Sequence, residues 1–77
     1  MIDRVNFRVT ANSCSGLLCK ILGLFAQLGL PAPTLQVSLV GVSMRIELSL
    51  ANFGDALVQI VARRIAGFVG VQSVTVI

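Results

Sequence analysis

Residues 4–28 read RVNFRVTANSCSGLLCKILGLFAQL, and a change of hydrophobic period inside this stretch decides the fold. Val5, Phe7 and Val9 alternate with polar residues, which predicts a strand with one buried and one solvated face. From Gly16 onward the apolar residues recur at helical spacing instead. The stretch therefore predicts a strand that leads directly into an amphipathic helix.

Small residues mark both ends of this helix. Ser13 or Ser15 is expected to cap its start, because serine side chains accept hydrogen bonds from free N–H groups there. Gly29 stands where a glycine commonly ends a helix. Pro31 and Pro33 then favour an extended connector, because the residue before a proline avoids helical geometry.

Two further stretches, residues 35–39 and 44–50, again alternate apolar and polar side chains. Gly41 lies between them, and a glycine between two alternating stretches is typical of a hairpin with a short turn. These stretches are therefore expected to be the second and third strands.

A second helix is expected after this hairpin, with Asn52 as its cap and Gly67 and Gly70 at its end. Residues 71–77 are rich in β-branched side chains, which favours a last strand. The buried face of the second helix is expected to consist of Leu57, Ile60, Val61, Ile65 and Phe68.

The predicted order is β-α-β-β-α-β, and it indicates an α+β, ferredoxin-like fold in a single domain spanning residues 1–77. A four-stranded antiparallel sheet carries both helices on one face, and the strands follow the order fourth, first, third, second. The second strand then forms an edge without charged residues, which predicts a homodimer through this sheet edge. The opposite face of the sheet is expected to expose Arg4, Asn6, Arg8, Arg45 and Glu47.

The composition favours a protein that binds another protein. Apolar residues make up 56% of the chain and charged residues 12%, whereas about 25% charged is usual. A composition this apolar and this low in charge excludes a disordered chain. The apolar residues are also more than a small core can bury, so part of the surface is expected to be an interface. The net charge of +3 is scattered along the chain, and the exposed sheet face has no aromatic residue, so no nucleic-acid partner is expected.

The sequence also argues against a membrane span, although residues 21–44 carry no charge. Pro31 and Pro33 would break a helix there. Asp3 and Arg4 precede any apolar stretch, so no signal peptide is expected and a cytoplasmic location is predicted.

The sequence offers few residues that could be catalytic or bind a metal. The chain has no histidine, and Cys14 and Cys19 would lie about 140° apart around a helix, so no metal site, cofactor or catalytic residue is expected. Both cysteines are expected to pack as small apolar groups. Residues 12–16 can offer free N–H groups to a carboxylate, although spacing alone favours a plain serine cap with a flexible glycine.

Residues 16–29, GLLCKILGLFAQLG, resemble the first helix of ACT domains in the small regulatory subunit of acetolactate (acetohydroxyacid) synthase. That family shows the pattern P-G-V-L-x-R-I-x-G-L-F-x-R-R-G. Residues 44–51 and 68–74 are similar to a strand and to the ending of its short members, so the resemblance covers essentially the whole chain. The positions that match the helix pattern are Gly16, Leu18, Ile21, Gly23, Leu24, Phe25 and Gly29.

The resemblance implies a non-catalytic subunit that forms ACT dimers, binds the large thiamine-diphosphate-dependent catalytic subunit and raises its activity. It also implies binding of a branched-chain amino acid between the first loop of one protomer and the residues after the first helix of its neighbour. The positions that correspond to that site are Ser13, Cys14, Ser15, Gly16, Leu17 and Leu18, together with Leu30, Pro31 and Ala32.

Two departures from the family pattern weaken the expected amino-acid feedback. Ser13 and Pro31 stand where the family has asparagines, and proline offers neither a side-chain hydrogen bond nor an N–H group. The C-terminal domain of the family's long members has no counterpart in these 77 residues. Two other interpretations stay open: a free-standing ACT module that senses an amino acid for another enzyme or regulator, and a ferredoxin-like domain with a metal or redox role through Cys14.

Overall fold

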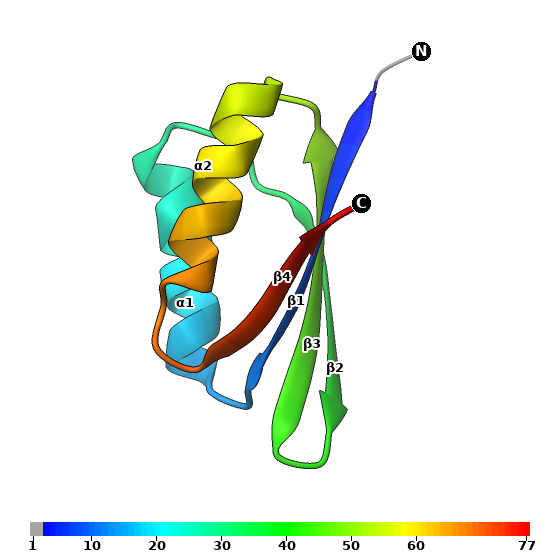
Figure 1. Ribbon diagram of the computed structural model, residues 1–77, viewed down its shortest axis with the longest axis vertical. Helices are drawn as coiled ribbons and strands as arrows, with labels where there is room; N and C mark the ends of the chain where they lie inside the picture. The colour runs from blue at the N-terminus through cyan, green and yellow to red at the C-terminus, as the bar shows by residue number, and fades with distance from the viewer. Residues whose placement is uncertain (1–2) are drawn as a thin grey trace.

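The computed structural model describes residues 3–77, and its elements follow the predicted order. They are β1 (Arg4–Asn12), α1 (Ser15–Gln27), β2 (Thr34–Val40), β3 (Ser43–Ala51), α2 (Asp55–Ala66) and β4 (Val71–Val76) (Figure 1). This βαββαβ chain forms the ferredoxin-like α+β fold that the sequence predicts.

The four strands form one antiparallel sheet in the order β2-β3-β1-β4, as predicted. β1 and β3 are its centre and pair along their whole length, from Arg4 opposite Ala51 to Asn12 opposite Ser43. Both helices cover the same face of the sheet and leave the other face open (Figure 1). We call that uncovered side the open face.

The core lies between the helices and the two central strands. Phe7 stands at its middle, with its ring centroid 6.3 Å from both the Phe25 ring and the Phe53 ring. Alternate residues of β1 and β3 are buried there, as the period of two predicts. The remaining buried side chains of the core are Val5, Val9, Ala11, Leu17, Ile21, Leu24, Met44, Ile46, Leu48, Leu50, Val58, Val61 and Ile65.

Two turns confirm the roles expected of their glycines. Gly29 has φ +71, and the Leu30 N–H donates to the Phe25 carbonyl at 2.9 Å, which together form a Schellman ending of α1. Gly41 has φ +60 at the first position of the two-residue loop between β2 and β3. A positive φ at that position is what a type II′ hairpin turn requires.

The cap predicted for α1 is wrong. Cys14 is the N-cap residue and makes no side-chain cap hydrogen bond. Ser13 lies one residue before the N-cap, and its N–H donates to the Val42 carbonyl of the hairpin turn at 3.0 Å. Ser15 is already the first helical residue.

The start of α2 and part of its buried face also differ from prediction. Gly54, with φ +103, is the N-cap residue, and the side chain of Asn52 accepts the Gly54 N–H at 2.8 Å in a local turn. Val58 is buried, whereas Ile60 is 46% exposed and Leu57 is only partly buried. Apolar residues at 57, 58, 60 and 61 spread over an arc of about 160° of this helix, so periodicity left its exact orientation ambiguous.

The two edge strands differ in their cover. β4 is packed against α2. Every residue of β2 is exposed, including the apolar side chains that point to the helix side, because the helix layer does not extend over this strand. Of these side chains, Val37 is 39% and Leu39 is 70% exposed. β2 therefore has a free hydrogen-bonding edge next to an apolar strip.

Candidate functional site

The loop that joins β1 to α1 forms one wall of a cavity of about 280 Å³. Residues 13–16 of this loop are exposed, as an accessible site requires. The opposite wall comes from the turn before β4, nearly sixty positions further along the chain. The lining residues are Asn12, Cys14, Gly16, Leu17, Lys20, Val69 and Gly70.

Hydrogen bonds hold the two walls together. The Asn12 N–H donates to the Gly70 carbonyl at 2.8 Å, and the Asn12 side-chain oxygen accepts from the Gln72 amide at 3.0 Å. Gly70 has φ +98, and a Cβ there would stand 3.5 Å from Leu17. These contacts join the β1–α1 loop to the turn before β4.

The loop offers fewer free donors than the sequence indicated. The Ser13 N–H is already bonded to Val42, so it cannot bind a ligand without breaking that contact. Within residues 3–77, the N–H groups of Cys14, Ser15 and Gly16 have no backbone acceptor. They lie at the positive end of the α1 dipole, and Lys20 is the charged residue in the lining. The site thus suits a carboxylate better than an ammonium group.

The second predicted segment, Leu30, Pro31 and Ala32, lies at the opposite end of α1. The helix has 13 residues, so about 20 Å separate its two ends. Leu30 and Ala32 line a different, mostly apolar groove of about 290 Å³, together with Leu22, Phe25, Ala26 and Pro33. One chain therefore does not bring the two predicted segments together.

The cysteines do not pack as predicted. Cys14 and Cys19 are both free and both exposed, because Cys14 precedes the first helical turn and Cys19 falls on the solvent side of α1. Among the described residues, no group of three His, Cys, Asp or Glu side chains could hold a metal ion.

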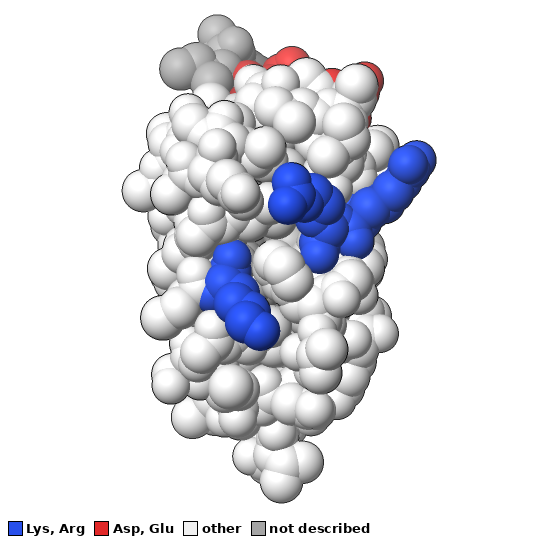
Figure 2. Space-filling model, turned by 90° about the vertical axis from the view of Figure 1, so that its left-hand side faces the viewer, with Lys and Arg blue, Asp and Glu red and all other residues white. Residues whose placement is uncertain are grey.

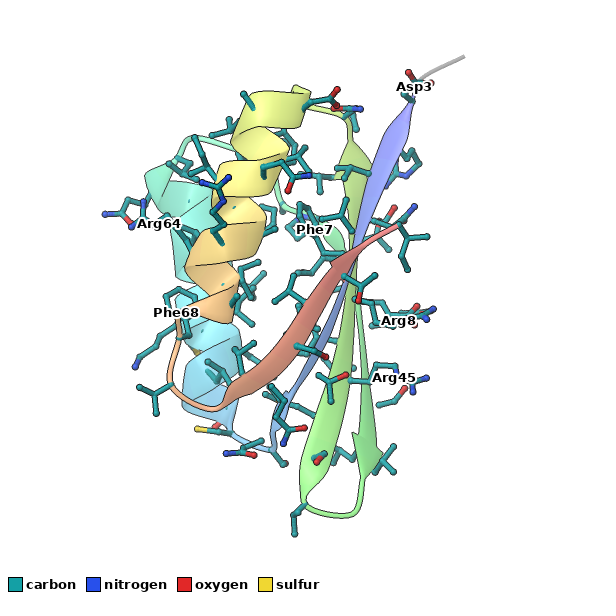
Figure 3. All side chains as sticks on the ribbon, in the orientation of Figure 1. Asp3, Phe7, Arg8, Arg45, Arg64 and Phe68 are labelled. Atoms are coloured by element: carbon teal, nitrogen blue, oxygen red, sulfur yellow. The ribbon has the colours of Figure 1, made fainter. Side chains whose placement is uncertain are left out.

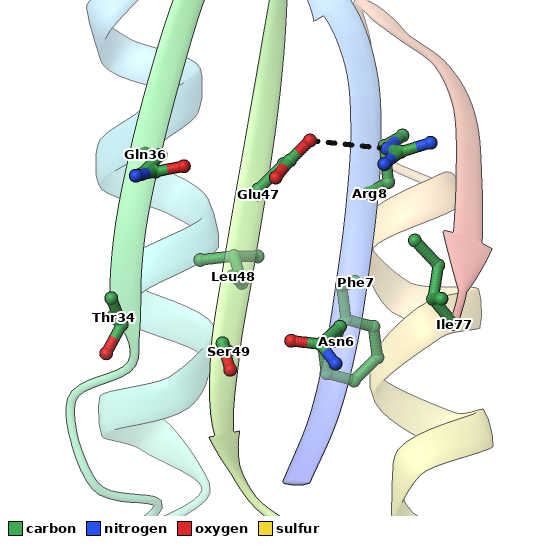
Figure 4. A pocket seen from close by; sticks show the side chains of 9 residues that line it. All are labelled: Asn6, Phe7, Arg8, Thr34, Gln36, Glu47, Leu48, Ser49 and Ile77. Carbon is green, nitrogen blue, oxygen red and sulfur yellow. Dashed lines mark ion pairs between the residues drawn. The ribbon is translucent and has the colours of Figure 1, made fainter.

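The open face carries a third cavity, of about 360 Å³, where β1, β2 and β3 form a shallow concave surface (Figure 4). Arg8 and Glu47 form an ion pair across it, with 3.4 Å between Nε and Oε1. Polar side chains of Asn6, Thr34 and Ser49 line the same surface. Arg4, Asn6, Arg8 and Arg45 are exposed and Glu47 is partly exposed, which confirms the predicted face.

Sequence reasoning missed three residues of the loop cavity: Lys20, Val69 and Gly70. Lys20 could have been found, since it lies one helical turn after Gly16 and so shares its side of α1. Val69 and Gly70 could not, because the predicted pairing of the first with the last strand did not include its register, which places Ala11 opposite Val71.

Two solved structures have the same fold as this chain. The crystal structure of the ACT domain from GTP pyrophosphokinase of Chlorobium tepidum aligns over 100% of both chains with a TM-score of 0.82 and 12% identity. The solution NMR structure of that domain aligns over 97% of this chain and 85% of its own with a TM-score of 0.79, again at 12% identity. At such identity the likeness concerns the fold alone.

The fold thus defines an ACT-type domain. The chain belongs to the ACT-like domain family, whose model matches residues 2–77. ACT domains are generally regulatory, ligand-sensing and non-catalytic. No curated protein matches the chain. Neither α1 nor α2 is long and apolar enough to cross a membrane, and the described residues contain no other helix that could.

Proposed function

We propose that the chain is a non-catalytic regulatory subunit of an acetolactate-synthase-type enzyme in branched-chain amino-acid biosynthesis. It is a single ACT domain over residues 1–77 that acts in the cytoplasm, without a cofactor of its own, by binding the large thiamine-diphosphate-dependent catalytic subunit. The observation that carries the proposal is the sequence of α1, which resembles the first helix of that family's small subunits.

One of the matching residues has no explanation inside this chain. Gly23 lies in the middle of α1, where glycine costs about 1 kcal/mol relative to alanine. A Cβ at Gly23 would have nothing within 4 Å, so the fold of the monomer does not need a glycine there. Gly23 is exposed beside Leu22 and Ala26. A glycine on an exposed, apolar helix side supports close approach by another chain.

The first such chain is a second copy. The free edge of β2 can pair with its own symmetry mate around a two-fold axis, which would extend the sheet to eight strands. Leu35, Val37 and Leu22 would then be covered, and all three are exposed in the monomer. The same axis would bring the loop after α1 of one copy toward the other copy, so that a shared amino-acid site can form.

We expect amino-acid feedback to be weak or absent. The loop cavity can hold a carboxylate, but an ammonium group also needs acceptors. Ser13 and Pro31 replace the family's two asparagines, and Lys20 repels a positive charge. An unpaired charged donor costs more than the roughly 1–3 kcal/mol of a neutral one, and each 1.4 kcal/mol is about tenfold in affinity.

Calorimetry with valine, leucine and isoleucine measures this directly. The expected result is no binding, or a dissociation constant far above the micromolar range, for all three amino acids. A low-micromolar constant for any of them would contradict the expectation and show that backbone carbonyls supply the missing acceptors.

A second candidate function is an ACT module that senses a small amino acid for another enzyme or regulator. The preformed cavity between the β1–α1 loop and Gly70 favours it, because a purely structural subunit does not need one. Purification of the tagged chain from native extract distinguishes the two functions. A large thiamine-diphosphate enzyme in the complex supports the first, and a different enzyme in its place supports the second.

A further inference from the structure

The open face is the side of the molecule that the dimer proposed above leaves uncovered. Its central strands expose Arg4 and Arg8 from β1 and Arg45 and Glu47 from β3. Figure 3 shows Arg8 and Arg45 pointing away from the helices, whereas Phe7 points toward them. With three arginines and one carboxylate, the charged side chains of these two strands sum to +2.

These positive charges are only partly neutralised by neighbours. Arg8 forms an ion pair with Glu47 at 3.4 Å, but both side chains are close to half exposed. Arg4 donates to a neutral hydroxyl, that of Ser49, at 3.0 Å. Arg45 lies between Thr10 and Ser38 in the sheet register and has no carboxylate partner in residues 3–77. The face can therefore donate charge-assisted hydrogen bonds to an incoming partner.

The other three basic residues are placed differently. Arg63 and Arg64 lie in the last turn of α2, where positive side chains complement the helix dipole, so their position has a local explanation. Basic side chains on the helix layer lie near one another toward the middle of its surface, and acidic ones are visible at one end of the molecule (Figure 2). Arg45, in contrast, lies in strand β3 and has no helix dipole to complement.

We infer that the open face is a docking surface for an acidic surface of a partner protein. Charge complementarity selects the partner: arginines and hydroxyls are donors, and carboxylates are the acceptors that match them. The concave surface beside Arg8 and Asn6 can take an acidic side chain of that partner (Figure 4). If the proposed function holds, this partner is the catalytic subunit.

A nucleic acid fits this face less well. Single-stranded nucleic acids bind to sheets through aromatic side chains that stack on bases. The rings of Phe7, Phe25 and Phe53 pack together on the helix side, and Phe68 packs against the same core. Glu47 would also repel phosphates. The observations therefore favour a protein.

The size of the face agrees with a protein interface. Strands about 4.8 Å apart and about seven residues long give the four-stranded sheet an area of about 450 Å². A stable interface buries about 800 Å² on each partner. The dimer would double the face to about 900 Å², so two copies side by side present enough surface.

The test compares two double variants with the same change of charge on opposite sides of the molecule. Arg8→Gln with Arg45→Gln alters the open face, and Arg63→Gln with Arg64→Gln alters the helix layer at the end of α2. The probe is a fluorescent peptide of 20 glutamates, followed by anisotropy at low salt. We expect the open-face pair to weaken binding roughly tenfold and the helix pair to change it less than about threefold. Glu47→Gln, which removes the competing carboxylate, is expected to strengthen binding.

Several outcomes would overturn the inference. One is that the unmodified chain does not bind the peptide. Another is that the helix pair loses as much peptide affinity as the open-face pair, or more. A third is that a single-stranded oligonucleotide binds more tightly than the peptide. Arg8→Lys with Arg45→Lys, which keeps the charge, should retain most of the affinity, so a folding defect cannot imitate the result. Repeating the series with the acetolactate synthase catalytic subunit separates the two proposals. If the peptide pattern holds but that subunit does not bind, the proposed function fails and the docking surface stands.

Discussion

A lysine in place of Val37 should convert the proposed dimer into an 8.1 kDa monomer. Val37 is in the middle of the β2 edge strand and points to the helix side, where it is 39% exposed. In the proposed eight-stranded sheet the two-fold axis would bring two such lysines close together and away from water. Burial of two unpaired charges should weaken association by about 100-fold or more. Sedimentation equilibrium at micromolar concentration measures the change.

Val76→Lys is a matched control for this substitution. Val76 lies on β4, the other edge of the same sheet, and is 37% exposed. If β2 is the interface, Val76→Lys should leave the dimer intact. A monomer with Val76→Lys and a dimer with Val37→Lys would place the interface at β4 instead. An unmodified chain that sediments only as a monomer would remove the dimer altogether.

Phe7→Ala should remove a large share of the protein's free energy of unfolding. The Phe7 ring is 1% exposed, packs edge-on against Phe25 and lies stacked with Phe53. Replacing a buried phenylalanine with alanine costs about 3–5 kcal/mol, and a domain of this size has only about 4–12 kcal/mol in total. Urea unfolding followed by circular dichroism, at one fixed protein concentration, gives the difference.

Val69→Ala serves as the comparison for the Phe7 variant. Val69 is 90% exposed in the turn before β4, so its truncation should change the free energy of unfolding by less than about 0.5 kcal/mol. A loss below about 1 kcal/mol with Phe7→Ala would mean that the ring is not at the centre of the core.

The order of the elements could be predicted because the spacing of apolar residues clearly distinguishes the strands from the helices. Val5, Phe7 and Val9 alternate, and all three are buried. Gly29 ends α1 with the positive φ that its position indicated. The details that failed depend on tertiary contacts. Ser13 contacts the hairpin turn through its N–H, and Cys14 instead of Ser13 or Ser15 is the N-cap of α1.

The candidate site could be predicted only in part. The resemblance placed residues around the β1–α1 loop, and Cys14, Gly16 and Leu17 do line a cavity there. The opposite wall, Val69 and Gly70, depends on the register between β1 and β4; the sequence predicted that these strands pair but not which residues lie opposite one another. Leu30 and Ala32 lie at the far end of α1, so a site that joins both segments requires the second copy.

The most direct test of the central proposal is a titration of the purified acetolactate synthase catalytic subunit with this chain, followed by the rate of acetolactate formation. We expect a rate that rises with added chain and saturates near a fixed ratio of the two proteins. Phe7→Ala, which destabilises the folded domain, should give a smaller rise at the same concentrations. A rate that stays unchanged up to a large excess of the folded chain would contradict the proposed function.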